Sequence, residues 1–422
     1  MVGENPRYIL CFCQVHGLLG RAAHWHYLAA QLREQLADDG VLLYISQVNE
    51  HTKTYQGIDV CGDRLVEELG EVLATYPSLQ EISFVGHSMG GLIARYAAGK
   101  LFDPETRLIA DRLRPVHYVS LATPHLGCDL LPGICEVPLV SWLCAPPVVG
   151  RAIGFVVRPF VSGVVCRHLR RSARQFFLTD GDDGAAPLVE RLAKDEDARG
   201  GRYLAALAAF ETRTLYANVS GDHLVSWTNA SLRERHELPE IAEARRACGV
   251  VREEPLWRAW DKGNAPSEEA FERGGGERNA SAKPLRLELG DAASRADKHE
   301  EHEHEQAELG LLLPVAEGAI MDGHPSPTTT QCNVEDAGAI SDSTRDFTQR
   351  RRAATFNAML CALRTLQWRR VDVSFAKCLL PRLAHQHIQM QRSWLNGAGK
   401  GVAQHVAASI ASMERARKGR GC

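Results

Sequence analysis

The sequence lacks several features that would assign it to a specialised class of protein. It contains no run of 18 or more apolar residues, so no transmembrane helix is predicted. Its 12 cysteines include no C-x-x-C pair and no Cys/His spacing typical of zinc, so we expect neither a disulfide framework nor a structural zinc site. The formal net charge is only −3, which gives no general electrostatic attraction to nucleic acid.

The N-terminal stretch also lacks the pattern of a secretory signal. In MVGENPRYILCFCQVHG, an acidic residue and a proline precede the apolar run, and that run has the length of a buried strand. We therefore expect a cytoplasmic protein with free thiols. Peripheral attachment to a membrane or a lipid-droplet surface, and import into an organelle, are left open.

Strand-like and helix-like segments alternate along the chain. In the first part, strands are predicted over 8–15, 41–48, 81–85 and 116–122, and helices over 21–37, 58–76 and 89–101. Further on, helices are predicted over 187–210, 353–366 and 402–413, and strands over 213–219 and 370–375. Apolar spacings of three and four residues mark the helices, and short apolar runs mark the strands. This order favours a mostly parallel sheet with helices on both faces.

Two segments depart from this pattern. Residues 130–166 are apolar and rich in Pro and Gly, which fits either an ordinary packed subdomain or a cap that covers an active site and touches lipid. We place this cap at 126–170. Residues 251–350 include GGGERN, HEEHEHE and PSPTTT with few aromatics, which predicts a disordered insertion. Its His/Glu run, which includes His299, His302 and His304, is typical of a solvated segment rather than a metal site.

The insertion would divide one catalytic domain into two parts. The first part is predicted to span 7–250 and the second 351–413. Residues 414–422, ERARKGRGC, are interpreted as a basic, solvated tail.

The most specific motif is GHSMGG at residues 86–91, between a predicted strand and a predicted helix. This is the setting of a nucleophile elbow, a tight strand-to-helix turn that exposes a reactive serine. Such a turn leaves no room for side chains two residues before and after the nucleophile, where Gly86 and Gly90 stand. Ser88 is therefore the candidate nucleophile, with His87 as its neighbour in the elbow.

A second motif, VHGLLG at 15–20, ends the first strand. A His-Gly turn there can present a backbone N–H to a substrate oxyanion, and the residue after the nucleophile supplies another. We expect the donors to be Leu18 and Met89, with Gly17 beside them. His16 is interpreted as structural.

A serine nucleophile needs a base, and the base needs an orienting acid. In this fold the acid follows the serine along the chain and the histidine comes last. Asp222 lies just past the strand 213–219, where α/β sheets build their sites, and is the preferred acid. The acids of the DGDD loop are the alternatives: Asp180, Asp182 and Asp183.

The base is expected after the last strand. The sequence LAHQH in that loop offers His385 and His387. His405 falls within the terminal helix pattern and is interpreted as structural. His125 precedes the acid and is expected to hold the base of the cap.

With these motifs in place, the chain resembles the DUF676 family of putative serine esterases, which have the α/β-hydrolase fold. The resemblance covers roughly residues 8–250 and 353–412. The matching stretches are VHGLLG, NEHTKTYQGIDVCGDRLVEEL, FVGHSMGGLIARYAAGKL, SLATPHLG, FFLTDGDDGAAPLVERL, YANVSGDHLVSWTNASLR and QWRRVDVSF. Within the family, FFLTD and YANVSGDHLV resemble a plant and algal branch. The insertion is not typical of the family.

The resemblance implies a Ser-Asp-His triad on Ser88, Asp222 and a late histidine. Family members commonly carry A-H-N after the last strand, and the chain has A-H-Q there, which favours His385 over His387. It also implies acylglycerols or phospholipid acyl esters as substrates. We thus expect a serine hydrolase that needs no metal or organic cofactor. The alternatives are a small-molecule carboxylesterase, a lipid acyltransferase, and a non-catalytic protein that binds a lipid or a protein partner.

Overall fold

The structure, a computed structural model, describes residues 10–36, 40–128, 170–181, 185–195, 201–254 and 342–419. Residues 129–169 of the predicted cap at 126–170, the histidine run and most of the predicted insertion lie outside these residues. The chain divides into two compact units, Met1–Trp257 with Ser343–Cys422 and Arg258–Asp342. Of the second unit, only Asp342 is among the described residues, so the description below concerns the first.

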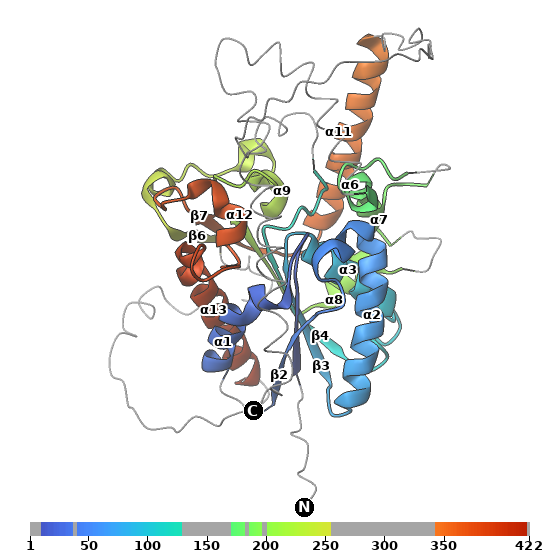
Figure 1. The fold of residues 1–422 in the computed structure, drawn as a ribbon. Coiled ribbons are helices and arrows are strands. Elements are labelled where there is room, and N and C mark those ends of the chain that lie inside the picture. The colour runs from blue at the N-terminus through green and yellow to red at the C-terminus, as the bar shows by residue number, and fades with distance from the viewer. Residues whose placement is uncertain are drawn as a thin grey trace, which may run out of the picture. The chain divides into compact units, whose positions relative to one another are not determined.

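A seven-stranded sheet forms the centre of this unit, in the order β2-β1-β3-β4-β5-β7-β6 (Figure 1). Its strands are β1 (Leu10–Val15), β2 (Val41–Ile45), β3 (Glu81–His87), β4 (Arg114–Leu121), β5 (Thr212–Asn218), β6 (Gly249–Glu254) and β7 (Arg369–Ser374). Every neighbouring pair is parallel except β6 with β7, which is antiparallel. The predicted α/β-hydrolase fold, with its mostly parallel sheet, is confirmed.

Helices cover both faces of the sheet. α1 (His26–Gln35) packs with α13 (Lys400–Lys418) on one face, while α2 (Ile58–Thr75) and α8 (Tyr203–Ala209) pack with α3 (Met89–Leu101) on the other. Alternate side chains of one strand point to opposite faces, and β1 shows the result. Its Cys11, Cys13 and Val15 join the core beneath α2 and α3, whereas Leu10 and Phe12 join the core beneath α1 and α13.

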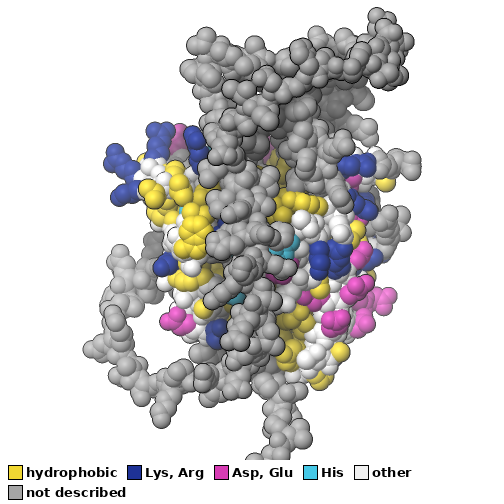
Figure 2. Space-filling view, viewed as in Figure 1, with side chains coloured by type: hydrophobic (Ala, Val, Ile, Leu, Met, Phe, Trp, Pro, Cys, Tyr) yellow, Lys and Arg dark blue, Asp and Glu magenta, His cyan; other side chains and the backbone are white. Residues whose placement is uncertain are grey.

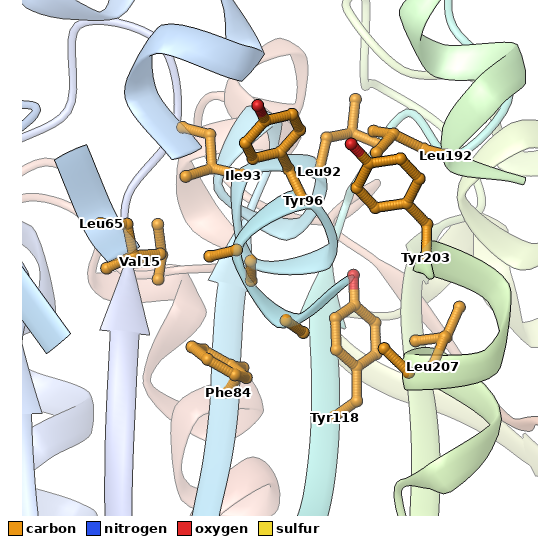
Figure 3. Packing of buried hydrophobic residues seen from close by; sticks show 14 of the residues in the cluster. Val15, Leu65, Phe84, Leu92, Ile93, Tyr96, Tyr118, Leu192, Tyr203 and Leu207 are labelled. Atoms are coloured by element: carbon orange, nitrogen blue, oxygen red, sulfur yellow. The ribbon is translucent and has the colours of Figure 1, made fainter. Parts of the chain in front are cut away.

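Aromatic side chains fill the core around α3. Tyr96 of α3 and Tyr203 of α8 stack with 5.6 Å between ring centroids, and Tyr118 of β4 lies on the strand side (Figure 3). The Tyr118 hydroxyl donates a hydrogen bond to the Gly91 carbonyl at 2.9 Å. The helix after the candidate nucleophile is therefore held between the sheet and α8.

The remaining α-helices and 3₁₀-helices complete the described part of the chain. They are η1 (Ala22–Trp25), η2 (His51–Gln56), α6 (Arg170–Phe176), α7 (Leu188–Leu192), α9 (Trp227–Ser231), η4 (Arg235–Glu237), η5 (Ala242–Arg246), α11 (Asp342–Arg364), η7 (Pro381–Leu383), α12 (Ala384–His387) and η8 (Gly397–Gly399). No helix of the described residues has the length and apolarity required to cross a bilayer.

The structure differs from the predicted segments in four places. The single helix predicted over 187–210 is two helices, α7 and α8. The predicted insertion begins inside an ordered strand, because β6 pairs with β7, and it ends inside α11. The prediction of a solvated tail over 414–422 is wrong for residues 414–418. Helix α13 runs on to Lys418, since Glu414 is buried against His117 and Arg417 pairs with Glu81.

Candidate active site

Ser88 occupies the turn between β3 and α3 in the conformation expected of a nucleophile elbow. Its φ of 54° and ψ of −127° lie in a region that non-glycine residues rarely adopt. Its backbone N–H donates to the Leu121 carbonyl of β4 at 2.9 Å, which helps to hold the turn. The strain is thus supported by the neighbouring strand.

The two glycines of the motif are required by close backbone contacts. A Cβ on Gly90 would lie 2.0 Å from the carbonyl oxygen of Val15, and one on Gly86 would lie 2.5 Å from the Gly91 backbone. Both separations are far below any real carbon contact. Only glycine at these positions lets α3 start directly against β1 and β3.

The predicted oxyanion loop lies against Ser88. A Cβ on Gly17 would be 2.6 Å from the Ser88 Cβ and 3.2 Å from its Oγ, so the turn after β1 passes directly over the serine. A Gly20 N–H to Gly17 carbonyl bond of 3.0 Å closes this turn. Leu18 lies within it, and Met89 begins α3, where the first N–H groups have no acceptor in the helix. The structure therefore brings Gly17, Leu18 and Met89 to the serine.

Asp222 and His385 form a buried pair, although 163 positions separate them in the chain. The His385 Nδ1–H donates to Asp222 Oδ2 at 2.9 Å. The same carboxylate accepts from the N–H groups of Leu224 and Val225, at 3.0 and 2.9 Å, and from the Asn218 amide at 2.8 Å. Four donors thus fix one carboxylate, and an imidazole whose single proton is on Nδ1 has a lone pair on Nε2.

The charge state of Asp222 follows from these contacts. Burial alone would raise its pKa, but His385 and the hydrogen bonds from Val225 and Asn218 lower it below the ordinary value for an aspartate. Asp222 is therefore an anion at neutral pH. An anion at Nδ1 favours a positive charge on the imidazole after the ring takes up a proton at Nε2.

His87 connects this pair to the elbow, a contact that the sequence did not predict. Its Nε2–H donates to the backbone carbonyl of His385 at 2.8 Å, and the two rings are 4.8 Å apart. Burial and the nearby His385 keep the pKa of His87 well below its ordinary value, so it is neutral. Because His87 precedes Ser88 directly, its bond brings the His385 loop to the serine.

The alternative base and acid lie elsewhere. His387 donates from Nε2 to the Leu380 carbonyl at 2.9 Å and contacts the Asn396 amide through Nδ1 at 3.2 Å, so it makes no contact with Asp222. Asp180 accepts from the Leu188 N–H at 3.0 Å, at the start of α7. Asp182 and Asp183 fall outside the described residues. Of the candidates described, Asp222 and His385 are the pair brought together.

Three further histidines have surroundings of a structural kind. His405 lies in α13 and contacts Tyr216 and Glu253. His16 is buried and its Nδ1 faces the Gly17 carbonyl at 3.2 Å. His125 is buried beside Ser120 and Arg95, and burial holds its pKa well below the usual range.

A second carboxylate, Asp372 of β7, anchors the segment that follows Asp222. It accepts from the Trp227 indole at 2.7 Å and from two Arg233 nitrogens at 2.7 and 3.1 Å. Trp227 begins α9, directly after the Asp222 loop. This network was not predicted. The one sign of it in the sequence is the acidic residue inside the apolar strand RRVDVSF.

Metal chemistry finds no support in this part of the molecule. Among the residues that the structure describes, no group of three or more His, Cys, Asp or Glu side chains is placed to hold a metal ion. The arrangement instead offers a strained serine, a histidine with a free lone pair and a buried aspartate, which is the equipment for nucleophilic attack on a carbonyl carbon.

Sequence comparisons agree with this chemistry. The model of the family described as "Putative serine esterase (DUF676)" matches residues 9–145 and 154–232, just over half of the chain. The chain is 25% identical to Putative lipase C4A8.10 of Schizosaccharomyces pombe. The match covers 57% of this chain and 28% of that protein. It is 26% identical to Putative lipase ROG1 of Saccharomyces cerevisiae over 43% of its length, which covers 22% of that protein. The chain thus spans less than a third of either relative. Both are fungal, so the predicted plant and algal branch gains no support.

Two solved structures match parts of the chain. One is the RedJ thioesterase of Streptomyces coelicolor, 16% identical, with a TM-score of 0.28 over 55% of this chain and 76% of that one. Another is the phospholipase PlaB of Legionella pneumophila, 14% identical, with a TM-score of 0.29 over 50% of this chain and 38% of that one. Such low scores add nothing to the topology described above.

Proposed function

Because the chain belongs to the DUF676 family of putative serine esterases, we propose that it hydrolyses carboxylic esters of lipids, with Ser88, His385 and Asp222 as its catalytic triad. The observation that carries the proposal is the buried Asp222–His385 hydrogen bond, held against the elbow by His87. An aspartate and a histidine from distant parts of the chain meet beside a strained serine, as acyl transfer requires.

The proposed reaction proceeds in two steps through an acyl-enzyme. His385 Nε2 takes the proton of the Ser88 hydroxyl as Oγ attacks the ester carbonyl, and Asp222 stabilises the imidazolium that forms. The N–H groups of Leu18 and Met89 bind the oxyanion. The protonated histidine then gives its proton to the departing alcohol, and water, activated by the same histidine, releases the acid.

Two observations support a lipid substrate. The sequence places an apolar stretch, residues 130–166, directly after the strand and turn that follow the elbow helix. In addition, the fungal relatives carry the name lipase. We therefore propose acylglycerols or phospholipids as substrates, and peripheral contact with the membrane or droplet that contains them.

The first test is labelling with a fluorescent fluorophosphonate, which reacts with activated serines. The wild type should be labelled, and Ser88→Ala should not. Steady-state hydrolysis by Ser88→Ala should fall by about 10⁴ to 10⁶ if the triad acts as a unit. A matched control is Ser83→Ala, a buried serine of β3 five residues earlier, which should keep its labelling. A folded wild type that stays unlabelled, with and without lipid vesicles, would favour a binding protein over an enzyme.

The choice of substrate needs a second test. Hydrolysis rates would be compared over p-nitrophenyl esters of two to sixteen carbons and over diacylglycerol and phosphatidylcholine emulsions. A lipid hydrolase should prefer chains of eight carbons or more. A steep preference for acetyl esters would leave a small-molecule esterase. Adding a competing alcohol and analysing the products would distinguish hydrolysis from acyl transfer.

A further inference from the structure

The large hydrophobic side chains exposed in the described part of the chain belong to three loops. They are Leu379 at 95% exposure, Trp394 at 68%, Leu224 at 51% and Leu380 at 41%. Single exposed apolar residues are ordinary, but a cluster of them in otherwise well-buried surroundings marks an interaction surface. Leu224 follows Asp222 by two residues, and the other three flank His385 in sequence. These side chains therefore lie in the same segments as Asp222 and His385, or directly next to them in the chain.

Contacts link the segments that carry these side chains to one another. A Cβ on Gly221 would lie 2.2 Å from the Pro381 carbonyl, so the loop that carries Leu224 packs directly on the residue after Leu380. His387 then joins the Leu380 carbonyl to the Asn396 amide, two residues from Trp394. The same region in Figure 2, where Figure 1 shows β7 and α12, has hydrophobic side chains gathered next to Lys and Arg side chains.

The charge of this surface has one sign. Between Asp372 and Glu414 the chain contains no acidic residue, and the basic residues there are Lys377, Arg382, Arg392 and Lys400. Lys377 and Arg382 are exposed and stand on either side of Leu379 and Leu380 in the sequence. The adjoining stretch 223–247 is neutral, with four acidic and four basic side chains. Exposed Leu and Trp beside Lys and Arg, without acids between them, are complementary to a bilayer with anionic headgroups.

We propose that this surface, formed by Leu224, Leu379, Leu380, Trp394, Lys377 and Arg382, docks the protein onto an anionic membrane. The four apolar side chains would enter the boundary between headgroups and acyl chains, and the two cations would lie among the phosphates. The Asp222 and His385 loops would then face the bilayer, so an ester could reach Ser88 without crossing water. This deepens the lipid hydrolysis proposed above, but docking itself requires no turnover.

The test measures binding of full-length Ser88→Ala protein to vesicles, so that binding and hydrolysis fail separately. Vesicles of phosphatidylcholine alone would be compared with vesicles containing 30% phosphatidylserine, on the order of the anionic content of a cytoplasmic leaflet, by co-sedimentation. We expect binding to the anionic vesicles, weakened by raised salt. Lys377→Glu with Arg382→Glu should weaken it about tenfold or more. Leu379→Ser with Trp394→Ala should weaken it by a similar factor, roughly tenfold.

The matched control reverses two exposed cations between the end of α3 and the start of β4, Lys100→Glu with Arg107→Glu, on the side of the sheet where the parallel strands begin. It makes the same change in net charge and should bind within about twofold of the parent, because only charges within a Debye length of the lipid matter. All surface variants, rebuilt with Ser88 present, should hydrolyse a soluble acetyl ester normally. Equal losses in control and test pairs, binding without preference for anionic lipid, or no binding at all would overturn the proposal. So would variants that only abolish self-association, which would make the surface an interface between two copies.

Discussion

The two halves of the candidate active site are held in different ways. The Ser88 half is fixed by steric exclusion, because glycine Cα atoms touch neighbouring backbone and leave no space for a side chain. The half with Asp222 and His385 is fixed by hydrogen bonds between loops distant in the sequence, and the neighbouring segments carry exposed hydrophobic side chains. The proposed nucleophile is thus part of the sheet framework, whereas the proposed acid and base depend on loops that can be perturbed one bond at a time.

The strongest test of the hydrogen-bonded half is Asp222→Asn. An amide cannot stabilise the imidazolium and can favour the wrong tautomer of His385, so kcat/KM should fall by about 10⁴. Asp180→Asn is the matched control, because Asp180 is the alternative acid and contacts the Leu188 N–H instead. Rates of ester hydrolysis by the two variants decide whether Asp222 or Asp180 is the acid. A large loss in Asp180→Asn with near-normal Asp222→Asn would reverse the assignment.

The anchor beneath that half can be removed separately. Asp372→Ala leaves Arg233 buried without its main partner, which should lower the free energy of unfolding by about 3 to 5 kcal/mol. Urea denaturation measures this loss. Replacing both charges, Asp372→Leu with Arg233→Met, should recover much of it, because no isolated charge then remains buried. If the double variant is no more stable than Asp372→Ala, the ion pair is not the cause.

The steric half is tested by adding one methyl group. In Gly90→Ala the new Cβ would meet the Val15 carbonyl, so α3 and β1 must separate, and we expect a loss of about 3 kcal/mol in stability together with activity. Gly70→Ala is the control, since that glycine of α2 has no atom within 4 Å of its Cβ position and the change should stabilise the helix by about 0.5 to 1 kcal/mol. Thermal unfolding of both variants would show whether an added methyl group destabilises the elbow more than an open position on a helix.

The smallest expected effect concerns β6, at the sheet edge. Hydrogen bonds from His405 and Arg369 lower the pKa of Glu253 to about 2. Because the folded pKa lies below the unfolded one, Glu253 stabilises the fold above roughly pH 4.3 and loses this contribution as the pH falls towards 2. Glu253→Gln should therefore cost at most about 1 kcal/mol at pH 7, since surface pairs are screened. Urea titrations from pH 7 to 3 should show the difference from wild type shrinking, and a constant difference would exclude this linkage.

The sequence predicted the elements of the first half well, because their signals are local. The motif GHSMGG, the alternation in β1 and the apolar stripe of α2 each lie within one continuous segment. The strand β6 was missed because GVVREE has little alternation and its only neighbour in the sheet, β7, lies more than a hundred residues later. The continuation of α13 was missed for a similar reason, since Glu414 and Arg417 bind His117 and Glu81 from the other end of the chain.

The same reasoning explains which site residues were found. Ser88 and Asp222 were proposed from motifs and their order, and the family resemblance favoured His385 over His387. The structure places Asp222 and His385 in contact. The contacts of His87, Asp372 and His387 were not predicted. Their partners are, in turn, a distant backbone carbonyl, an indole with a guanidinium group, and an asparagine amide. Local patterns indicate residue types but contain no information on such pairings.

The place of β7 in the sheet affects how the protein is made. β7 lies between β5 and β6, yet it is synthesised after both of them. At about 5 to 20 residues per second, the ribosome takes several seconds or more to pass from the end of β6 to β7, and during that time β5 has an open edge. His385 emerges later still. With the triad proposed above, a nascent chain therefore contains Ser88 long before His385, and the catalytic pair with Asp222 would form only after β7 has been made.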